Sequence, residues 1–235
     1  MSGYGYHEVI IETPEHNTSL AKMPETQIKE IMWAYVKRFQ EIRKDKNIKY
    51  IQIFKNKGRE AGATLSHPHS QLIATPIVPI TIRSEIEGAK SYYDFRERCV
   101  FCDIISQELS QKVRVVFKTS EFVVIEPYAS RFPYETWILP LKHSHDFGSI
   151  ETKPPLVEDL AKAISIITKR FEKKIDDPPF NLVIHTAPFV EGLDQYYHWH
   201  IEIIPRLTNI AGFEWGTGFN INHIAPEQAC TDLSE

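Results

Sequence analysis

The fold of this chain is decided by a short stretch in its first third, Ser66-His67-Pro68-His69-Ser70-Gln71. Side chains of an extended strand alternate between two faces, so His67, His69 and Gln71 would share one face with about 7 Å between neighbours. The segment 56–64 before it contains two glycines and an asparagine, which allows backbone N–H groups to approach an anion closely. The stretch therefore predicts a strand that directs a histidine at a phosphate.

A second His-x-His row occurs at His198 and His200, and the elements around it repeat as well. His16 precedes His67 by 51 positions, and His143 precedes His198 by 55. Periodicity predicts strands at 7–12, 50–54 and 67–74 with a helix at 24–44, then strands at 113–117, 122–126, 136–141, 180–185 and 197–204 with a helix at 156–174.

This repetition predicts an α+β fold of two related repeats, each an antiparallel sheet with a packed helix. Each copy needs the same order of strands and helix to bury the apolar side of its helix on a sheet. We expect the boundary in the polar segment 80–98, which lacks a strong pattern. The expected domains are residues 1–82 and 83–235.

Composition limits the function classes. The chain has 235 residues, 42% of them hydrophobic and 25% charged, which is typical of a globular protein. A net charge of −4 argues against a nucleic-acid or membrane-surface binder, and no apolar run approaches the ~20 residues that span a bilayer. The N-terminus lacks a signal pattern, and three cysteines favour a reducing cytoplasm over a disulfide framework.

The chain resembles the galactose-1-phosphate uridylyltransferase branch of the histidine-triad superfamily. The residues that carry the resemblance are Asn56-Lys57-Gly58, Gly62, His67-Pro68-His69-x-Gln71, His16 after Pro14, Glu85, and His185 with His198-x-His200. The resemblance implies two histidine-triad-like repeats and a double displacement through a covalent nucleotidyl-histidine. It also implies a homodimer whose active sites are completed by the partner subunit.

On this resemblance, His69 attacks the α-phosphorus of a nucleoside diphosphate sugar and expels a sugar 1-phosphate. A neutral imidazole is nucleophilic near pH 7, and Gln71 can donate to a phosphate oxygen as charge builds. Asn56, Thr64 and the backbone around Gly62 would complete the phosphate cradle.

The second copy carries Glu202 where the first has Gln71, and a carboxylate there would repel phosphate oxygens. The second copy is therefore expected to do no chemistry. The alternative for the first copy is that His67 and His69 lie on a half-exposed strand and have no functional role.

The second copy instead predicts a zinc site. Cys99 and Cys102 are separated by two residues, a gap that lets both thiolates reach one Zn²⁺, and two more ligands usually close such sites. His143 and His198 are favoured, because they hold matching places in the repeat and the family carries similar sites there. The alternatives are a disulfide and a plain thiol pair.

Two further metal sites follow from the resemblance. Glu85, His185 and His200 match positions that hold an additional metal in some relatives. His16 and His67 match positions that the family joins to a cysteine pair, which would lie about 25 residues before Met1 here. The chain is thus expected to be N-terminally short, and a zinc at His16 and His67 would have only two protein ligands.

The substrate remains divided between two classes. Relatives recognise the hexose partly through a segment corresponding to 212–218, so Trp215 and Thr217 are expected substrate-binding residues, with core packing the alternative for Trp215. The expected activity is UDP-glucose:hexose-1-phosphate uridylyl transfer. The glycine-rich segment also fits an ADP-glucose-type phosphorylase or adenylyltransferase, and an inactive zinc-stabilised module stays open. Hydrolases of the superfamily usually carry His at the Gln71 position, which favours transfer.

Overall fold

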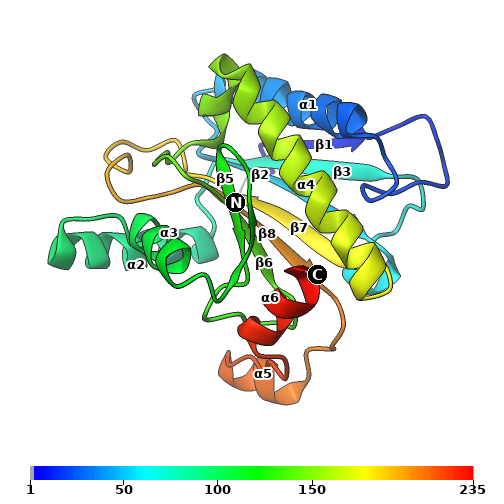
Figure 1. Ribbon diagram of the computed structural model, residues 1–235. Helices are drawn as coiled ribbons and strands as arrows, with labels where there is room; N and C mark the ends of the chain where they lie inside the picture. Colours follow the sequence, from blue (N-terminus) through cyan, green and yellow to red (C-terminus); the bar gives the residue numbers. More distant parts are fainter. Residues whose placement is uncertain (1–2, 235) are drawn as a thin grey trace.

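The structure is a computed structural model that describes residues 3–234. Its strands form one eight-stranded antiparallel sheet in the order β1-β3-β2-β7-β8-β6-β5-β4 (Figure 1). The strands are β1 (Tyr6–Ile11), β2 (Tyr50–Lys57), β3 (His69–Thr75), β4 (Val115–Lys118), β5 (Phe122–Ile125), β6 (Thr136–Pro140), β7 (Phe180–His185) and β8 (His200–Pro205).

The helices of the described residues lie between and beyond these strands. They are α1 (Glu25–Arg43), α2 (Ile80–Arg96), α3 (Val100–Gln111), α4 (Pro154–Lys174), α5 (Gly212–Thr217) and α6 (Pro226–Ser234), with short 3₁₀ turns η1 (Arg59–Ala61) and η2 (Phe147–Thr152). None of them is both long enough and apolar enough to cross a lipid bilayer.

The α+β class is confirmed, but the expectation of a separate sheet in each half is corrected. The halves meet at β2 and β7, which pair antiparallel with Ile53 opposite Ile184. This pairing satisfies backbone groups that two separate sheets would leave exposed along an edge. The two halves therefore share one continuous sheet and one main core.

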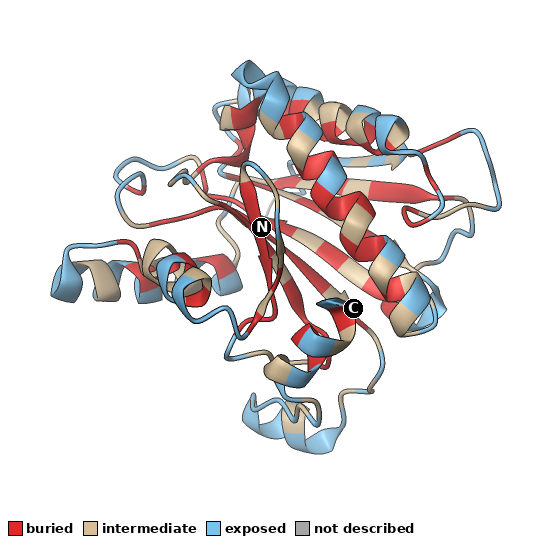
Figure 2. Cartoon of the chain, in the orientation of Figure 1, coloured by how far each residue is buried: buried red, intermediate tan, exposed pale blue. Residues whose placement is uncertain are grey.

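Helices α1 and α4 cover one face of that sheet (Figure 1). Each buries a stripe at helical spacing, as the periodicity predicts. The stripe of α1 comprises Ile28, Ile31, Met32, Tyr35, Val36, Phe39 and Ile42, and that of α4 includes Leu160, Ile164, Ile167 and Phe171. Figure 2 shows these buried stripes turned toward the sheet and the exposed ones turned outward.

Helix α3 packs on the opposite face over the second half of the sheet. Phe101 stands with its ring centroid 5.0 Å from that of His200 and 6.4 Å from that of Trp137. Together with Val123 and Leu139 it forms a separate small core. This second layer holds the residues around Cys99 against the sheet.

Several predicted boundaries shift. The polar segment 80–98 was expected to lack a pattern, but residues 80–96 form α2, which buries little besides Ile82 and Ala89. A helix with so few buried positions leaves only a weak periodic signal. His67 and His198 precede β3 and β8 rather than lying within them.

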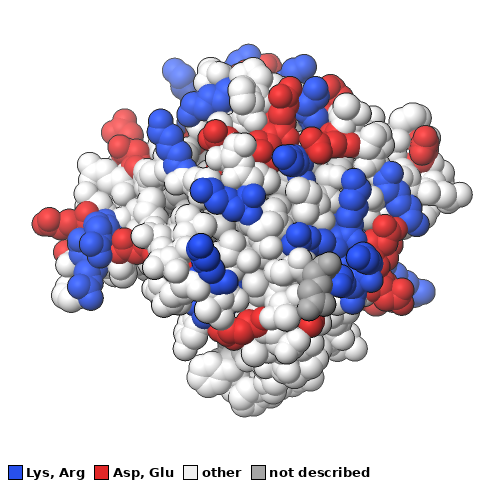
Figure 3. All heavy atoms as spheres, viewed as in Figure 1, with Lys and Arg blue, Asp and Glu red and all other residues white. Residues whose placement is uncertain are grey.

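The surface shows a contrast between charged and apolar regions. In Figure 3, basic and acidic side chains are interspersed over α1 and α4, whereas the part formed by α5 and its flanking loops carries few charges. Residues 207–221 of that part expose apolar side chains, namely Phe213, Trp215, Phe219 and Ile221.

Candidate functional site

A cavity of about 690 Å³ opens beside the stretch that begins β3. Five predicted residues line it: the expected catalytic and phosphate-binding residues His69, Asn56, Gly62 and Thr64, and the expected metal ligand His67. Strand β2 supplies Asn56, and the loop between β2 and β3 supplies Gly62 and Thr64. The structure thus brings the predicted nucleophile and the predicted phosphate cradle to one cavity.

His69 is oriented by the backbone. It is the first residue of β3, and only 5% of its surface is exposed. Its Nδ1 donates a hydrogen bond to the carbonyl oxygen of His67 at 2.8 Å. Because Nδ1 carries the proton, the lone pair of the neutral ring resides on Nε2. This is the tautomer that a nucleophilic histidine needs.

The loop in front of His69 depends on glycine. Gly58 has φ 83°, and a Cβ added there would lie 2.8 Å from Pro179 Cβ. Gly62 ends η1 in the left-handed region at φ 86°. Both positions would be strained with any other residue, and at Gly58 a side chain would also clash with Pro179 just before β7.

Asn181 on β7 holds this loop, a residue that sequence analysis missed. Its Nδ2 donates to Asn56 Oδ1 and to Ala61 O, both at 2.8 Å. Asn56 and Asn181 are also partners in the β2–β7 ladder. The second half of the chain therefore holds the loop that is expected to cradle phosphate in the first half.

A buried polar network lies behind His69. Lys55 Nζ donates to Glu12 Oε2 at 2.7 Å and to His69 O at 3.1 Å. Ser70 donates to the other oxygen of Glu12, and the Tyr35 hydroxyl bonds to Ser70. Burial, reinforced by the Glu12 charge, raises the pKa of Tyr35 well above its usual value.

This network was missed, although the sequence carries a signal for it. Lys55 lies two and four positions after Ile53 and Ile51 on β2, so its side chain points to the same face, the one that faces the core. A lysine at an inward position of a strand requires a buried acidic partner, and Glu12 supplies it.

Gln71 follows His69 on the same face of β3, with Phe54 on one side and Val9 on the other. Its Oε1 accepts a hydrogen bond from His7 Nε2 at 2.9 Å. Within residues 3–234 it does not line the cavity. Its amide would need to turn from His7 to reach a phosphate.

Trp215 and Thr217 lie on α5, far along the chain from the cavity and outside its lining within residues 3–234. Trp215 is 77% exposed, so its core packing is ruled out in the isolated chain. Among residues 3–234, the lining of the cavity beside His69 includes none of 212–218.

The predicted zinc ligands come together. One ligand atom each of Cys99, Cys102, His143 and His198 lies within 4.8 Å of the others. Cys102 Sγ is 3.2 Å from His143 Nδ1 and 3.6 Å from His198 Nδ1. The three cysteines are free thiols, so the disulfide alternative is not formed.

The second nitrogen of each zinc-site histidine is fixed by a backbone carbonyl. His143 Nε2 donates to Asp194 O at 2.7 Å, and His198 Nε2 donates to Pro140 O at 3.0 Å. Both Nδ1 lone pairs therefore face the cysteines, which is the outer hydrogen bonding that metal-bound histidines use. The hydrogen bond from Cys102, which outweighs burial, lowers the pKa of the Cys99 thiol. The donor set fits Zn²⁺.

His16 and His67 form a similar pair in the first half. Their Nδ1 atoms are 3.2 Å apart, and His67 Nε2 donates to Thr13 O at 2.7 Å. The ring centroids are 5.2 Å apart, the same separation as for His143 and His198. No third His, Cys, Asp or Glu of residues 3–234 joins this pair as a ligand group.

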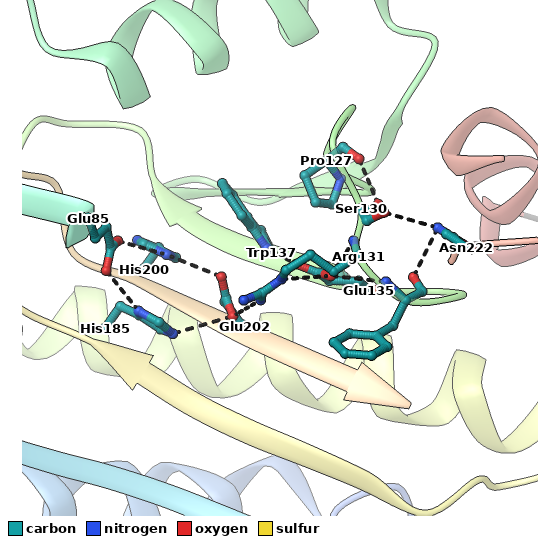
Figure 4. Close-up of polar contacts among 12 residues, drawn as sticks. Glu85, Pro127, Ser130, Arg131, Glu135, Trp137, His185, His200, Glu202 and Asn222 are labelled. Atoms are coloured by element: carbon teal, nitrogen blue, oxygen red, sulfur yellow. Dashed lines mark hydrogen bonds and ion pairs between the residues drawn. The ribbon is translucent and has the colours of Figure 1, made fainter. Parts of the chain in front are cut away.

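Glu85, His185 and His200 also converge, and Glu202 and Arg131 complete the cluster (Figure 4). His185 Nδ1 lies 3.1 Å from Glu85 Oε2, and His185 Nε2 lies 3.4 Å from Glu202 Oε2. Arg131 donates to Glu202 in turn. Both nitrogens of His185 thus face carboxylates.

Charge in this cluster is balanced by protonation. Burial opposes the charged form of His185, but the hydrogen bonds with Glu202 and Glu85 outweigh it and raise its pKa to about 10. Burial would raise the pKa of Glu202, yet its bonds with His185 and His200 hold it well below the usual range. A metal ion would have to displace the proton on His185.

Models of one protein family match both halves of the chain. Residues 1–79 match the N-terminal domain of galactose-1-phosphate uridyl transferase, and residues 85–233 match its C-terminal domain. The chain is 37% identical to an ADP-glucose phosphorylase of Arabidopsis thaliana over 235 residues, which is 99% of this chain and 65% of that protein. It is 33% identical to a galactose-1-phosphate uridylyltransferase of Thermotoga maritima, covering 98% of this chain and 74% of that one.

Two solved structures share the fold. A crystal structure of an Arabidopsis thaliana ADP-glucose phosphorylase with bound ADP-glucose superimposes with a TM-score of 0.92 at 36% identity, over 99% of this chain and 74% of that chain. A uridylyltransferase structure gives 0.91 at 31% identity, over 98% and 75%. The chain belongs to the galactose-1-phosphate uridylyltransferase family and contains matches to both of its domains.

Proposed function

We propose that this chain is a nucleotidyltransferase that works through a covalent nucleotidyl-histidine at His69. The observation that carries the proposal is the hydrogen bond from His69 Nδ1 to His67 O, which leaves the Nε2 lone pair for attack beside a glycine-lined cavity. The chain spans 65% of the length of the plant phosphorylase that it resembles, so the activity is a proposal for this chain.

The first displacement begins when His69 Nε2 attacks the α-phosphorus of a nucleoside diphosphate sugar. The bond to the bridging oxygen breaks, and the sugar 1-phosphate leaves with that bond's electron pair. Nδ1 keeps its proton throughout, and His67 O stabilises the positive charge that the substituted ring acquires. Asn56, Thr64 and the amides near Gly62 are the proposed partners of the phosphate oxygens, with Gln71 turning toward them.

The second displacement returns the enzyme to its starting state. A phosphate oxygen attacks the nucleotidyl phosphorus, the P–Nε2 bond breaks, and its electron pair returns to His69. The ring leaves as neutral imidazole, which is a good leaving group because Nδ1 is already protonated. No additional proton donor is needed at the ring.

Two donors are proposed for this chemistry. ADP-glucose is favoured by the 36% identity to the phosphorylase crystallised with that ligand. UDP-glucose with a hexose 1-phosphate acceptor is the second candidate, favoured by the 33% identity to the Thermotoga maritima transferase. Inorganic phosphate as acceptor would make the enzyme a phosphorylase, and galactose 1-phosphate would make it a uridylyltransferase.

The two halves are proposed to have different roles, one catalytic and one structural. Residues 1–82 form a catalytic histidine-triad-like repeat, and residues 83–235 form a second, structural one that binds Zn²⁺ at Cys99, Cys102, His143 and His198. The similar ring separation in the His16–His67 and His143–His198 pairs supports a common origin of the repeats. Free thiols suit a reducing cytoplasm.

Intact-mass measurement tests the central step. Incubation with ADP-glucose or UDP-glucose should add one nucleotidyl group, and the added mass identifies the base. His69→Ala should abolish the adduct, while His145→Ala, a histidine outside the cavity, should not. Absence of any adduct with both donors would reject the proposed enzyme and leave the inactive zinc-stabilised module.

We also propose a homodimer in which α5 of one chain completes the cavity of the other. The exposed apolar side chains Phe213, Trp215, Phe219 and Ile221 form a surface suited to burial against a partner. Complementation tests this arrangement. Co-expressed His69→Ala and Trp215→Ala chains should regain about a quarter of the wild-type rate, because half of randomly paired dimers hold one intact site. No recovery above either variant alone would exclude it.

A further inference from the structure

Three cationic side chains line the cavity beside His69: Lys55, Lys57 and Arg59. Lys55 is held by Glu12 and by the carbonyl of His69. Lys57 Nζ is ion-paired with Asp177 and donates to Pro178 O at 3.2 Å. Both lysines are thus neutralised by carboxylates of the protein itself.

Arg59 differs from these two lysines. It is exposed, it begins η1 directly after Gly58, and no ion pair or side-chain hydrogen bond engages its guanidinium within residues 3–234. Its backbone is nevertheless fixed, since Arg59 O accepts from Gly62 N at 2.9 Å. A positioned backbone with an unpaired guanidinium is suited to an anionic ligand, because the planar fork of arginine matches two phosphate oxygens.

The charge of the reaction requires such a group. In each proposed displacement two phosphates lie in the cavity. His69 and the proposed donors around it, Asn56, Thr64 and the amides near Gly62, bind only the phosphate that is transferred. The other phosphate leaves, or enters as a dianion, next to a negatively charged nucleotidyl group. Without a cation, that approach would be repulsive.

We infer that Arg59 binds the second phosphate, which departs with the sugar in the first displacement and attacks in the second. This inference rests on the proposed function. In the second displacement an oxygen of the Arg59-bound phosphate forms the new bond to phosphorus as the P–Nε2 bond breaks, and its electron pair returns to His69. Arg59 thereby determines use of a phosphate dianion as acceptor, whether inorganic phosphate or a sugar 1-phosphate.

Binding measurements in a His69→Asn background, which cannot turn over, locate the contact. We expect Arg59→Ala to weaken ADP and UDP binding by roughly 10- to 100-fold, the range for charge-assisted hydrogen bonds, and to leave AMP and UMP binding unchanged. Arg59→Lys should recover part of the loss. Arg83→Ala, which removes an exposed arginine on α2 away from the cavity, is the matched control. Equal effects on mono- and diphosphates, or none, would overturn the inference.

Single-turnover kinetics show which acceptor is preferred. They also distinguish failure of the Arg59 inference from failure of the proposed function. Nucleotidylated wild type and Arg59→Ala are challenged with inorganic phosphate, glucose 1-phosphate or galactose 1-phosphate. The concentration of the preferred acceptor that gives half-maximal discharge should rise roughly 10- to 100-fold in the variant. An unchanged value with every acceptor would refute the role of Arg59. If wild type forms no adduct, the proposed function fails, whereas the diphosphate binding comparison still tests Arg59.

Discussion

The carbonyl oxygen of His67 accepts a hydrogen bond from Nδ1 of His69, two residues along the chain, at 2.8 Å. The second half repeats this relationship between His198 O and His200 Nδ1 at 3.1 Å. Backbone geometry therefore fixes the ring in both rows. What distinguishes the rows is the residue two positions further along each strand, an amide at Gln71 and a carboxylate at Glu202.

Gln71→Glu should convert the first row into a copy of the second. The added charge repels the phosphate oxygens, and removal of one positioned donor typically costs ~100- to 1000-fold in rate. We expect the rate of His69 nucleotidylation, measured by intact mass over time, to fall by about that factor. Gln107→Glu on an exposed turn of α3 controls for the charge change, and an equally slow control would argue against a local role of Gln71.

Zinc should copurify with the chain and depend on the cysteine pair. Cys99→Ser and Cys102→Ser should lose the metal in elemental analysis, whereas Cys230→Ser, which replaces a cysteine outside the cluster, should retain it. Loss of a structural zinc removes several kcal/mol of folding free energy, so the melting temperature should fall by about 5–15 °C. Zinc content that survives Cys99→Ser would refute the assignment.

Lys55→Met should destabilise the fold, because it leaves Glu12 buried without a cation. Breaking a buried ion pair on one side costs about 3–5 kcal/mol, measurable as the free energy of unfolding in urea. The double variant Lys55→Met with Glu12→Gln should recover much of that loss. Additive losses in the double variant would show that the two side chains do not interact.

His185 should make folding stability depend on pH. Its folded pKa of about 10 lies above the ~6.5 of an unfolded histidine, so protonation stabilises the fold fully below about pH 6.5. That contribution declines as pH rises and is lost above about 10. Glu202→Gln should weaken this dependence, and the unfolding free energy measured from pH 6 to 10 compares the two proteins. Identical pH profiles would contradict the ion pairing.

Much of the site follows from residue order. His69 and Gln71 share a strand face because of period-2 alternation, and the glycines at 58 and 62 mark positions of positive φ. The repeated spacing of His16–His67 and His143–His198 anticipates both histidine pairs, since similar strand and helix lengths return the chain to the same place. The helical stripes of α1 and α4 likewise follow from their periodicity.

Other features depend on contacts between distant segments. The pairing of β2 with β7 joins the two halves of the chain into one sheet, and it brings Asn181 to Asn56 at the start of the glycine loop. Helix α2 has too few buried positions to show a periodic signal, yet it brings Glu85 to His185. No local sequence pattern predicts these contacts between residues that lie far apart in the chain.

The sequence by itself indicated the family through its motifs, and it offered His69 as a candidate nucleophile and four candidate zinc ligands. Strand alternation and the Cys99–Cys102 spacing act within short segments, so they can be recognised without a structure. His143 and His198 are matched to them through the repeat and the family resemblance. Only the tertiary structure decided which cations are already paired and which is free. Lys55, Lys57 and Arg59 look equivalent along the chain, but folding brings a carboxylate to each lysine, whereas no carboxylate of residues 3–234 pairs with Arg59 at the cavity. Ion pairing depends on distances of a few ångströms between residues far apart in sequence, and those distances exist only after folding.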